Sequence, residues 1–340
     1  MKRNYSVDFV KFLFAVMIAI GHFTGVDGII SGGKIVNLFF VMSGYFLVNS
    51  FNSGKYENSW QFTFQRIKRI YPYYIFAFIV IFLGIYISEG LGIFQLIDKF
   101  FKSLPEIFML QNIGVFPGGI NYPLWQLCTL IVVSHIMFSL LKWEKNLTLN
   151  VLCPLMAIGV YTYFANAYDV AAPKDWGVEC QFIYIPLVRA AGNLAIGMFA
   201  NYPINCCLEY LNRSDNKKTS IVVSIMGCLT IIAFLLNRDS YAIVIPFLLL
   251  LICLLHRKSI FTILFSAKIF SHFDRLSLAL YLNHAFIIMV YNKLSQWFPT
   301  CFLEQNNFLY LIVLIFYSII MIYVVDCIML HLKRIKNKLI

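Results

Sequence analysis

Long apolar runs dominate this sequence and limit what it can fold into. Ten such runs, most of about 20 residues, have the length of helix that crosses the hydrocarbon core of a bilayer. A helix satisfies its own backbone hydrogen bonds in lipid, whereas a β-barrel would show short alternating segments. Hydrophobic residues make up 60% of the 340 residues and charged residues only 13%. The sequence therefore predicts an all-α, polytopic membrane helix bundle.

The apolar runs give about ten expected transmembrane helices in one domain that covers 1–340, with no separate soluble domain and no cleavable signal peptide. The expected spans are 7–26, 35–52, 71–89, 122–142, 148–166, 181–202, 220–237, 241–256, 275–292 and 307–332.

The basic residues suggest how the chain crosses the membrane. With the N-terminus inside, 19 of the 27 Lys and Arg residues fall on inner segments and six on outer segments, and Lys11 and Arg189 lie within spans. Because Lys and Arg gather on cytoplasmic loops, we expect both termini to be cytoplasmic. The net charge of +11 then needs no nucleic-acid partner. The nine cysteines are scattered without a CxxC pair, so we expect no metal site.

Lys11 and His22 are polar residues inside the first span. They are 11 residues apart, which places them on one helix face with about 16 Å between them along the axis. Such a face suits a long anionic molecule, and histidine can act as a general base near neutral pH. Alternatively, Lys11 snorkels to the interface or pairs with Asp8, and His22 bonds a neighbouring carbonyl group.

Two further motifs have both a structural and a functional interpretation. Ser43-Gly44 in the second span is typical of close helix packing, or places a hydroxyl group towards His22. Arg66 and Arg69 share a helix face just before Tyr71-Pro72, where they anchor the inner surface or bind phosphate. We expect Pro72 to begin the third span.

Arg189 and His284 are also predicted to lie deep in the membrane. An arginine in the middle of a span cannot easily snorkel, so we expect Arg189 to face an aqueous cavity or a carboxylate. His284 can serve a site or make a structural hydrogen bond. The outer segment 90–121 begins with an amphipathic stretch that is expected on the membrane surface, followed by a Gly/Pro-rich stretch suited to an outer cavity.

In order and spacing, these features resemble the acyltransferase-3 family of bacterial membrane O-acyltransferases. The motifs are Lys11 and His22; Phe39-Phe40 with Ser43-Gly44 and Leu47; Arg66 and Arg69 before Tyr71-Pro72; Pro123-Leu124-Trp125; Arg189 with Gly197; and Ser277, Tyr281, Leu282 and His284. The resemblance covers nearly the whole chain. Two departures are Lys11, where arginine is common, and Gln126-Leu127-Cys128-Thr129, where many members have Ser-x-x-Glu.

The resemblance implies an enzyme that moves an acyl group, most simply acetyl, from cytoplasmic acetyl-CoA or another acyl-CoA to a sugar hydroxyl group. The acceptor would be a surface polysaccharide, an exopolysaccharide or a lipid-linked sugar, and the enzyme would lie in the inner (plasma) membrane. No metal is implied. Acyl-CoA, the acceptor and the bilayer are the expected partners, and the oligomeric state stays open.

The resemblance also implies roles for individual residues. The expected catalytic residues are His22 as base, with Lys11, Arg189 and Ser43; Arg66, Arg69 and Lys68 would bind CoA; and Trp125, Tyr45, Tyr281 and His284 would bind the acceptor. A polytopic glycolipid flippase without acyl transfer is the alternative, although it does not explain the basic residue, histidine and RxxR pattern. Binding of CoA would separate the two.

Overall fold

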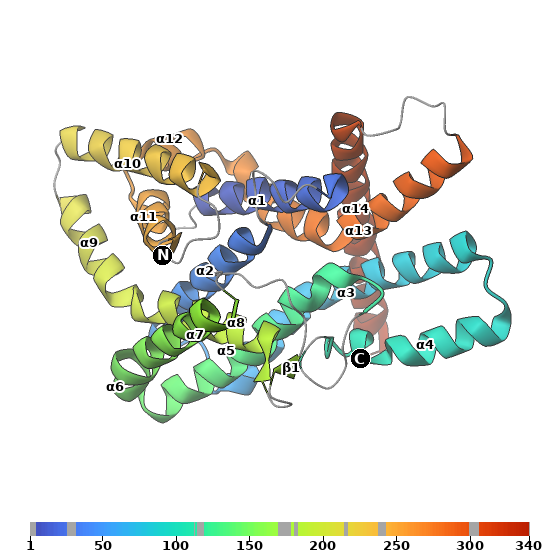
Figure 1. Cartoon of the computed structure of the whole chain (residues 1–340), viewed down its shortest axis with the longest axis horizontal. Helices are drawn as coiled ribbons and strands as arrows, with labels where there is room; N and C mark the ends of the chain where they lie inside the picture. The colour runs from blue at the N-terminus through green and yellow to red at the C-terminus, as the bar shows by residue number, and fades with distance from the viewer. Residues whose placement is uncertain are drawn as a thin grey trace.

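The computed structural model describes residues 5–25, 32–111, 113, 119–168, 178–179, 183–213, 217–236, 243–298 and 306–339. Within them, helices form nearly all of the regular structure (Figure 1). The helices are α1 (Tyr5–Thr24), α2 (Gly32–Asn52), α3 (Ser59–Glu89), α4 (Ile93–Ile107), η1 (Tyr122–Leu124), α5 (Trp125–Trp143), α6 (Lys145–Leu147), η2 (Thr148–Leu152), α7 (Cys153–Tyr168), α8 (Ile185–Phe199), α9 (Asn201–Arg213), α10 (Lys217–Leu236), α11 (Val244–Leu255), α12 (Ile260–Leu264), η4 (Lys268–His272), α13 (Phe273–Trp297) and α14 (Asn307–Leu339).

The predicted helical class is confirmed, with one small addition. The strands β1 (Val178–Glu179) and β2 (Ile183–Tyr184) pair antiparallel, with Val178 opposite Tyr184. Of the helices in the described residues, seven are long and apolar enough to span a bilayer. The sequence predicted about ten spans; α8, with 15 residues, is shorter than a usual span and lies largely buried against its neighbours. The expected turn at 238–240 lies outside the described residues.

Helices α2 and α8 approach each other closely because glycine lies at their contact. A Cβ atom on Gly44 would lie 2.1 Å from the Leu194 carbonyl oxygen, and one on Gly197 would lie 1.9 Å from that of Val41. Only glycine fits at such positions, since the backbone of the partner helix occupies the space of a side chain. The packing interpretation of Ser43-Gly44 therefore holds for Gly44.

Helix α3 begins before the expected span. The side chain of Asn58 accepts a hydrogen bond from the Gln61 backbone N–H, which caps the helix at that end. Pro72 lies inside this 31-residue helix rather than at its start. Pro72 therefore does not begin the helix, because the amphipathic stretch before it continues as the same helix. Gly90, in the left-handed conformation with φ 61°, ends the helix.

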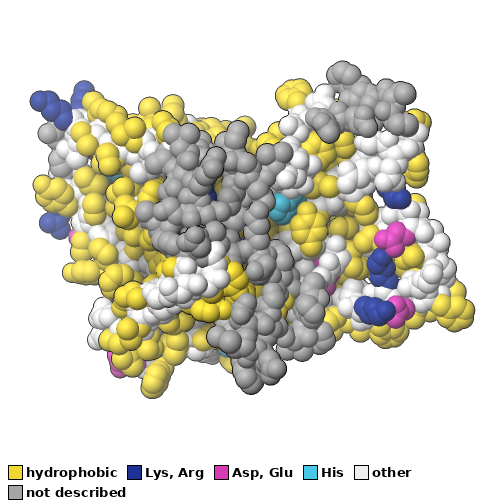
Figure 2. All heavy atoms as spheres, in the orientation of Figure 1, with side chains coloured by type: hydrophobic (Ala, Val, Ile, Leu, Met, Phe, Trp, Pro, Cys, Tyr) yellow, Lys and Arg dark blue, Asp and Glu magenta, His cyan; other side chains and the backbone are white. Residues whose placement is uncertain are grey.

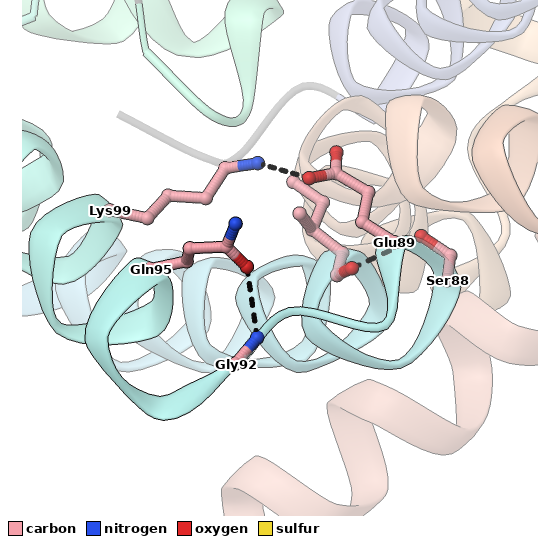
Figure 3. Close-up of polar contacts among 6 residues, drawn as sticks. Ser88, Glu89, Gly92, Gln95 and Lys99 are labelled. Atoms are coloured by element: carbon pink, nitrogen blue, oxygen red, sulfur yellow. Dashed lines mark hydrogen bonds and ion pairs between the residues drawn. The ribbon is translucent and has the colours of Figure 1, made fainter.

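Helix α4 returns beside the end of α3 to form a hairpin (Figure 1). Lys99 forms an ion pair with Glu89 at 2.8 Å, and the Gln95 side chain accepts from the Gly92 N–H at 3.0 Å (Figure 3). Phe94 and Phe101 of α4 are 84% and 63% exposed. Exposed aromatic side chains on one helix, with charged side chains beside them (Figure 2), fit a helix that lies on a membrane surface.

Candidate active site

Helices α1 and α13 pack along their lengths and bring two histidines together. Nδ1 of His22 lies 2.9 Å from Nε2 of His284. His284 is fully buried, whereas His22 is exposed. At least one histidine side chain reaches the face that Figure 2 shows. The contact joins residues that are 262 positions apart in the sequence. The buried His284 ring therefore fixes the orientation of the exposed His22 ring.

The hydrogen bonds determine which nitrogen of each ring carries the proton. Nδ1 of His284 lies 2.8 Å from the carbonyl oxygen of Tyr281. A carbonyl oxygen only accepts, so Nδ1 of His284 is the donor and Nε2 of the neutral ring is an acceptor. Nδ1 of His22 must then donate to it. The lone pair of His22 is left on Nε2, where it can take a proton from a substrate.

Tyr122, at the start of η1, also contacts His22. Its hydroxyl group lies 3.3 Å from His22 Nδ1, and its side chain is 46% exposed. The neighbouring Asn121 donates through Nδ2 to the Leu282 carbonyl oxygen at 2.9 Å. These two bonds hold the 121–122 segment against both histidine-bearing helices.

A buried carboxylate holds the same segment from the other side. Glu106 of α4 is 1% exposed and accepts from the backbone N–H groups of Ile120 at 2.6 Å and Asn121 at 3.0 Å. Burial raises the pKa of Glu106 to about 7, although these two bonds act in the opposite direction. A Cβ atom on Gly119 would lie 2.8 Å from Glu106 Oε2. Glu106 thus positions the residues that reach His22.

The first turn of α2 lies beside the Nε2 atom of His22. A Cβ atom on Gly32 would be 4.0 Å from His22 Nε2. Arg189 of α8, which is 5% exposed, donates to the Gly33 carbonyl oxygen at 2.6 Å and to Asn37 Oδ1 at 2.7 Å. The arginine therefore lies beside the site and binds the start of α2.

The predicted acceptor-binding residues Trp125 and Tyr281 lie next to this arrangement. The Trp125 ring faces the Arg189 guanidinium at 5.6 Å. The Tyr281 hydroxyl group donates to the Pro123 carbonyl oxygen, which ties α13 to the turn before α5. Both side chains are buried, at 6% and 8% exposure, so they form the wall of the site.

Lys11 lies further along the same helix interface. Its ammonium group is 3.6 Å from Asp274 of α13, and both side chains are partly exposed. The acidic partner that the structure gives Lys11 is thus on another helix. Because Asp274 precedes His284 by 10 residues and Lys11 precedes His22 by 11, α1 and α13 run parallel and in step.

The three predicted CoA-binding residues are on α3. Arg66 donates to the Ser134 hydroxyl group at 2.8 Å and faces the Phe62 ring at 4.9 Å. Lys68 and Arg69 are exposed. The structure therefore leaves two of the three cations open to solvent and binds the third to α5.

Two predicted residues lie away from the histidine pair. Ser43 is 11 residues from Gly32 along α2, or about 16 Å, and so lies several turns from the part of α2 that is next to His22. Tyr45 is fully buried and donates to Asn205 Oδ1 of α9 at 2.8 Å. The structure does not bring these two side chains to His22.

Sequence reasoning missed Glu106, Tyr122 and Asp274. The sequence did offer one indication of Glu106, which is the only acidic residue between Asp98 and Glu144. Its partners are backbone groups about 15 residues later, which no residue pattern indicates. The role of Asp274 could not be predicted, because no local sequence pattern indicates that α1 and α13 pack against each other.

Comparison with known families identifies the family of the chain. The family model described as an acyltransferase domain, that of the acyltransferase-3 family, matches residues 4–327. No curated protein and no solved structure matches the chain. The match spans both histidines, the α3 cations and Arg189. The chain, a multi-pass membrane protein, therefore belongs to the acyltransferase-3 family.

Proposed function

We propose that the protein transfers an acyl group, most simply acetyl, from cytoplasmic acyl-CoA to a hydroxyl group of an envelope sugar. The acceptor is a polysaccharide or a lipid-linked sugar, and both chain termini are cytoplasmic. The observation that supports the proposal most strongly is the His22–His284 contact of 2.9 Å. It places the lone pair of an exposed imidazole on Nε2, on a helix that also carries a cation for the donor.

In the proposed reaction, Nε2 of His22 removes the proton of the acceptor hydroxyl group. The oxygen attacks the thioester carbonyl carbon, the new C–O bond forms, and the C–S bond breaks. The proton then passes from His22 to the sulfur of the departing CoA, so that atoms and charge balance. His284 is a positioning residue in this scheme, since it touches His22 rather than the substrate.

The oxyanion of the tetrahedral intermediate needs hydrogen-bond donors near the base. The first turn of α2 begins beside Nε2, and the N–H groups of a first helical turn have no partner within the helix. We assign the oxyanion to this turn and to Arg189, which holds it in place through Gly33 and Asn37. This assignment does not require the Ser43 hydroxyl group.

The donor is proposed to approach from the α3 cations. Arg69 and Lys68 are exposed and suit the phosphates of CoA. Lys11 lies next on the route, about 16 Å from His22 along α1. An extended pantetheine arm along this face would bring the thioester to the histidine pair.

The acceptor is proposed to meet His22 beside Tyr122. The ring of Tyr122 is partly exposed and its hydroxyl group already touches His22, so a sugar stacked on the ring would present a hydroxyl group to Nε2. Trp125 and Tyr281 shape the wall behind it.

A transfer assay tests the proposed function. Membranes with wild-type protein, His22→Ala or His135→Ala are given radiolabelled acetyl-CoA, and label in the envelope glycan is counted at equal folded levels. His135 is the control, because it is a membrane histidine that bonds Thr63 at 2.9 Å on another helix pair. We expect wild type and His135→Ala to transfer label and His22→Ala to lose it. If wild type transfers no label from acetyl-CoA, acetyl is not the acyl group, and if longer acyl-CoA donors also give no transfer, the proposed function is wrong.

Binding of CoA tests the donor site separately. Arg69→Gln should weaken binding, whereas Arg213→Gln should not, because Arg213 is an exposed arginine of α9 whose partner is Glu209. Equal binding by all three proteins would contradict the α3 donor site. A flippase, the alternative from the sequence, should not bind CoA at all.

A further inference from the structure

A groove runs outward from the histidine pair between α3 and α13. Its walls are Ile81 and Ile85 on α3 and Ala285, Ile288 and Met289 on α13, around a cavity of about 340 Å³. This volume is at the small end of the range for ligand pockets, roughly 300–1,000 Å³. The walls are apolar, which distinguishes the groove from the polar surroundings of His22.

The groove is continuous with the reaction centre. Tyr122 lines its inner end and also touches His22, while Ala285 follows His284 directly in the chain. Ile81 and Ala285 at this end are 3% and 6% exposed. The deepest part of the groove therefore lies beside the atoms that would react.

The other end of the groove is polar. Asn292, Lys293 and Gln296 complete the lining, and Asn292 and Gln296 are exposed. Lys293 is eight residues from Ala285 on α13, so the apolar part extends over about 12 Å. Its wall is tight, because a Cβ atom on Gly84 would lie 2.5 Å from the Met289 methyl carbon.

The direction of the groove matches that of the donor. Lys11 lies about 16 Å from His22 on one side along the α1–α13 interface, and the groove leaves on the opposite side. A CoA thioester held by the α3 cations, with its carbonyl carbon at His22, would point its acyl group into the groove. An acetyl group would occupy only its inner end.

We propose that this groove receives the hydrocarbon chain of the acyl donor, so that the enzyme accepts unbranched acyl groups longer than acetyl. The inference rests on the proposed function and adds the class of acyl group to it. The bonds that form and break are those of the acetyl reaction, since the chain beyond the carbonyl carbon takes no part.

The chemistry of the walls favours a hydrocarbon chain over a sugar. A sugar in the groove would place hydroxyl groups against Ile81, Ile85 and Ile288, which have no side-chain donors or acceptors. Each buried hydroxyl group without a partner is unfavourable. A methylene group gains from the same walls, by about 0.8 kcal/mol when buried, or about a fourfold change in kcat/KM.

The test compares radiolabelled acetyl-CoA, butyryl-CoA and octanoyl-CoA as donors, with transfer into envelope glycan as the readout. Wild type should transfer butyryl with a kcat/KM several-fold above acetyl, and unlabelled octanoyl-CoA should compete with acetyl transfer. Ile85→Trp fills the groove and should lower the ratio of octanoyl to acetyl transfer by about tenfold or more. Ile79→Trp, on a 48% exposed position of α3 outside the groove, should keep the wild-type ratio.

The competition experiment uses wild type alone, so it stands if a tryptophan variant does not fold. If acetyl is transferred but the longer donors are neither transferred nor able to compete with acetyl-CoA, the groove assignment is wrong. The proposed function would remain intact. If Ile85→Trp lowers transfer from all donors equally, the groove assignment is also wrong. That result is expected if a membrane lipid, rather than the acyl chain, occupies the groove. If no donor of any length is transferred, the proposed function fails and the inference falls with it.

Discussion

The carboxylate of Asp274 lies 3.6 Å from the ammonium group of Lys11, across the same helix interface that joins His22 to His284. Lys11 and His22 are thus two points on one α1 face, and α13 meets each of them with a side chain of its own. The parallel register fixes a distance of about 16 Å between the cation and the base. That distance is the basis of the proposed donor path.

His284 should matter for transfer because it sets the tautomer of His22. We expect His284→Ala to lower kcat by about 10- to 100-fold, less than the loss of roughly 100- to 10,000-fold for removing a general base. His284→Gln, which can offer a carbonyl oxygen to His22 Nδ1, should recover part of the loss. Acyl-CoA binding should stay within a factor of about two. Equal activity of His284→Ala and wild type would contradict the positioning role.

Lys11 should act on donor binding more than on stability. Its ion pair with Asp274 is partly exposed, and such pairs stabilise proteins by only about 0–1 kcal/mol. We expect Lys11→Gln to raise the Kd for acyl-CoA by about tenfold, the size expected for one lost charged contact, with Tm little changed. Binding calorimetry and thermal unfolding in detergent check both. A large fall in Tm with unchanged Kd would make Lys11 structural.

The raised pKa of the buried Glu106 carboxyl group predicts that the stability of the protein depends on pH. Its ordinary pKa is 4.5, and burial raises the pKa in the folded protein to about 7. Between these values the folded state holds a proton that the unfolded state has released, so stability falls as pH rises through this window. Glu106→Gln removes that contribution, and its Tm should vary less from about pH 4.5 to 7. An unchanged pH profile would contradict burial as the cause.

Gly197 should tolerate no side chain. A Cβ atom there would lie 1.9 Å from the Val41 carbonyl oxygen, so Gly197→Ala should force α2 and α8 apart at a cost of about 1–3 kcal/mol or more. Gly159→Ala is the matched control, because nothing lies within 4 Å of the added atom and alanine favours helix by about 1 kcal/mol. Thermal unfolding should show opposite shifts. A similar small effect in both would mean that the helix contact is looser than described.

The helices and part of the site could be predicted from the sequence, because they depend on patterns among residues that are close together in the chain. The apolar runs predict the bundle, and the spacing of Lys11 and His22 predicts their common face. Arg189 was expected to face a cavity or a carboxylate, and the described contacts of its guanidinium include the amide oxygen of Asn37 and the backbone carbonyl oxygen of Gly33. These two contacts could not be predicted, because they depend on how α8 packs on α2.

The remaining features of the site could not be predicted, because they depend on how distant helices pack together. The partner of His22 is on a helix 262 residues away, and the protonation of its ring depends on a backbone carbonyl oxygen. Ser43 and Tyr45 share the α2 motif, yet α2 starts beside His22 at Gly32 and its later turns carry them away from His22. The groove beside His284 likewise arises only where α3 and α13 meet.

The most direct test of the central claim is chemical rescue of His22→Ala. Because His22 is exposed, added imidazole can reach the space that its ring leaves. Acetyl transfer from radiolabelled acetyl-CoA is measured in membranes with equal folded levels of the variant, against increasing imidazole. The account predicts a large loss without imidazole and a rise in proportion to its free-base concentration. Transfer by His22→Ala at the wild-type rate, with no response to imidazole, would show that His22 is not the base.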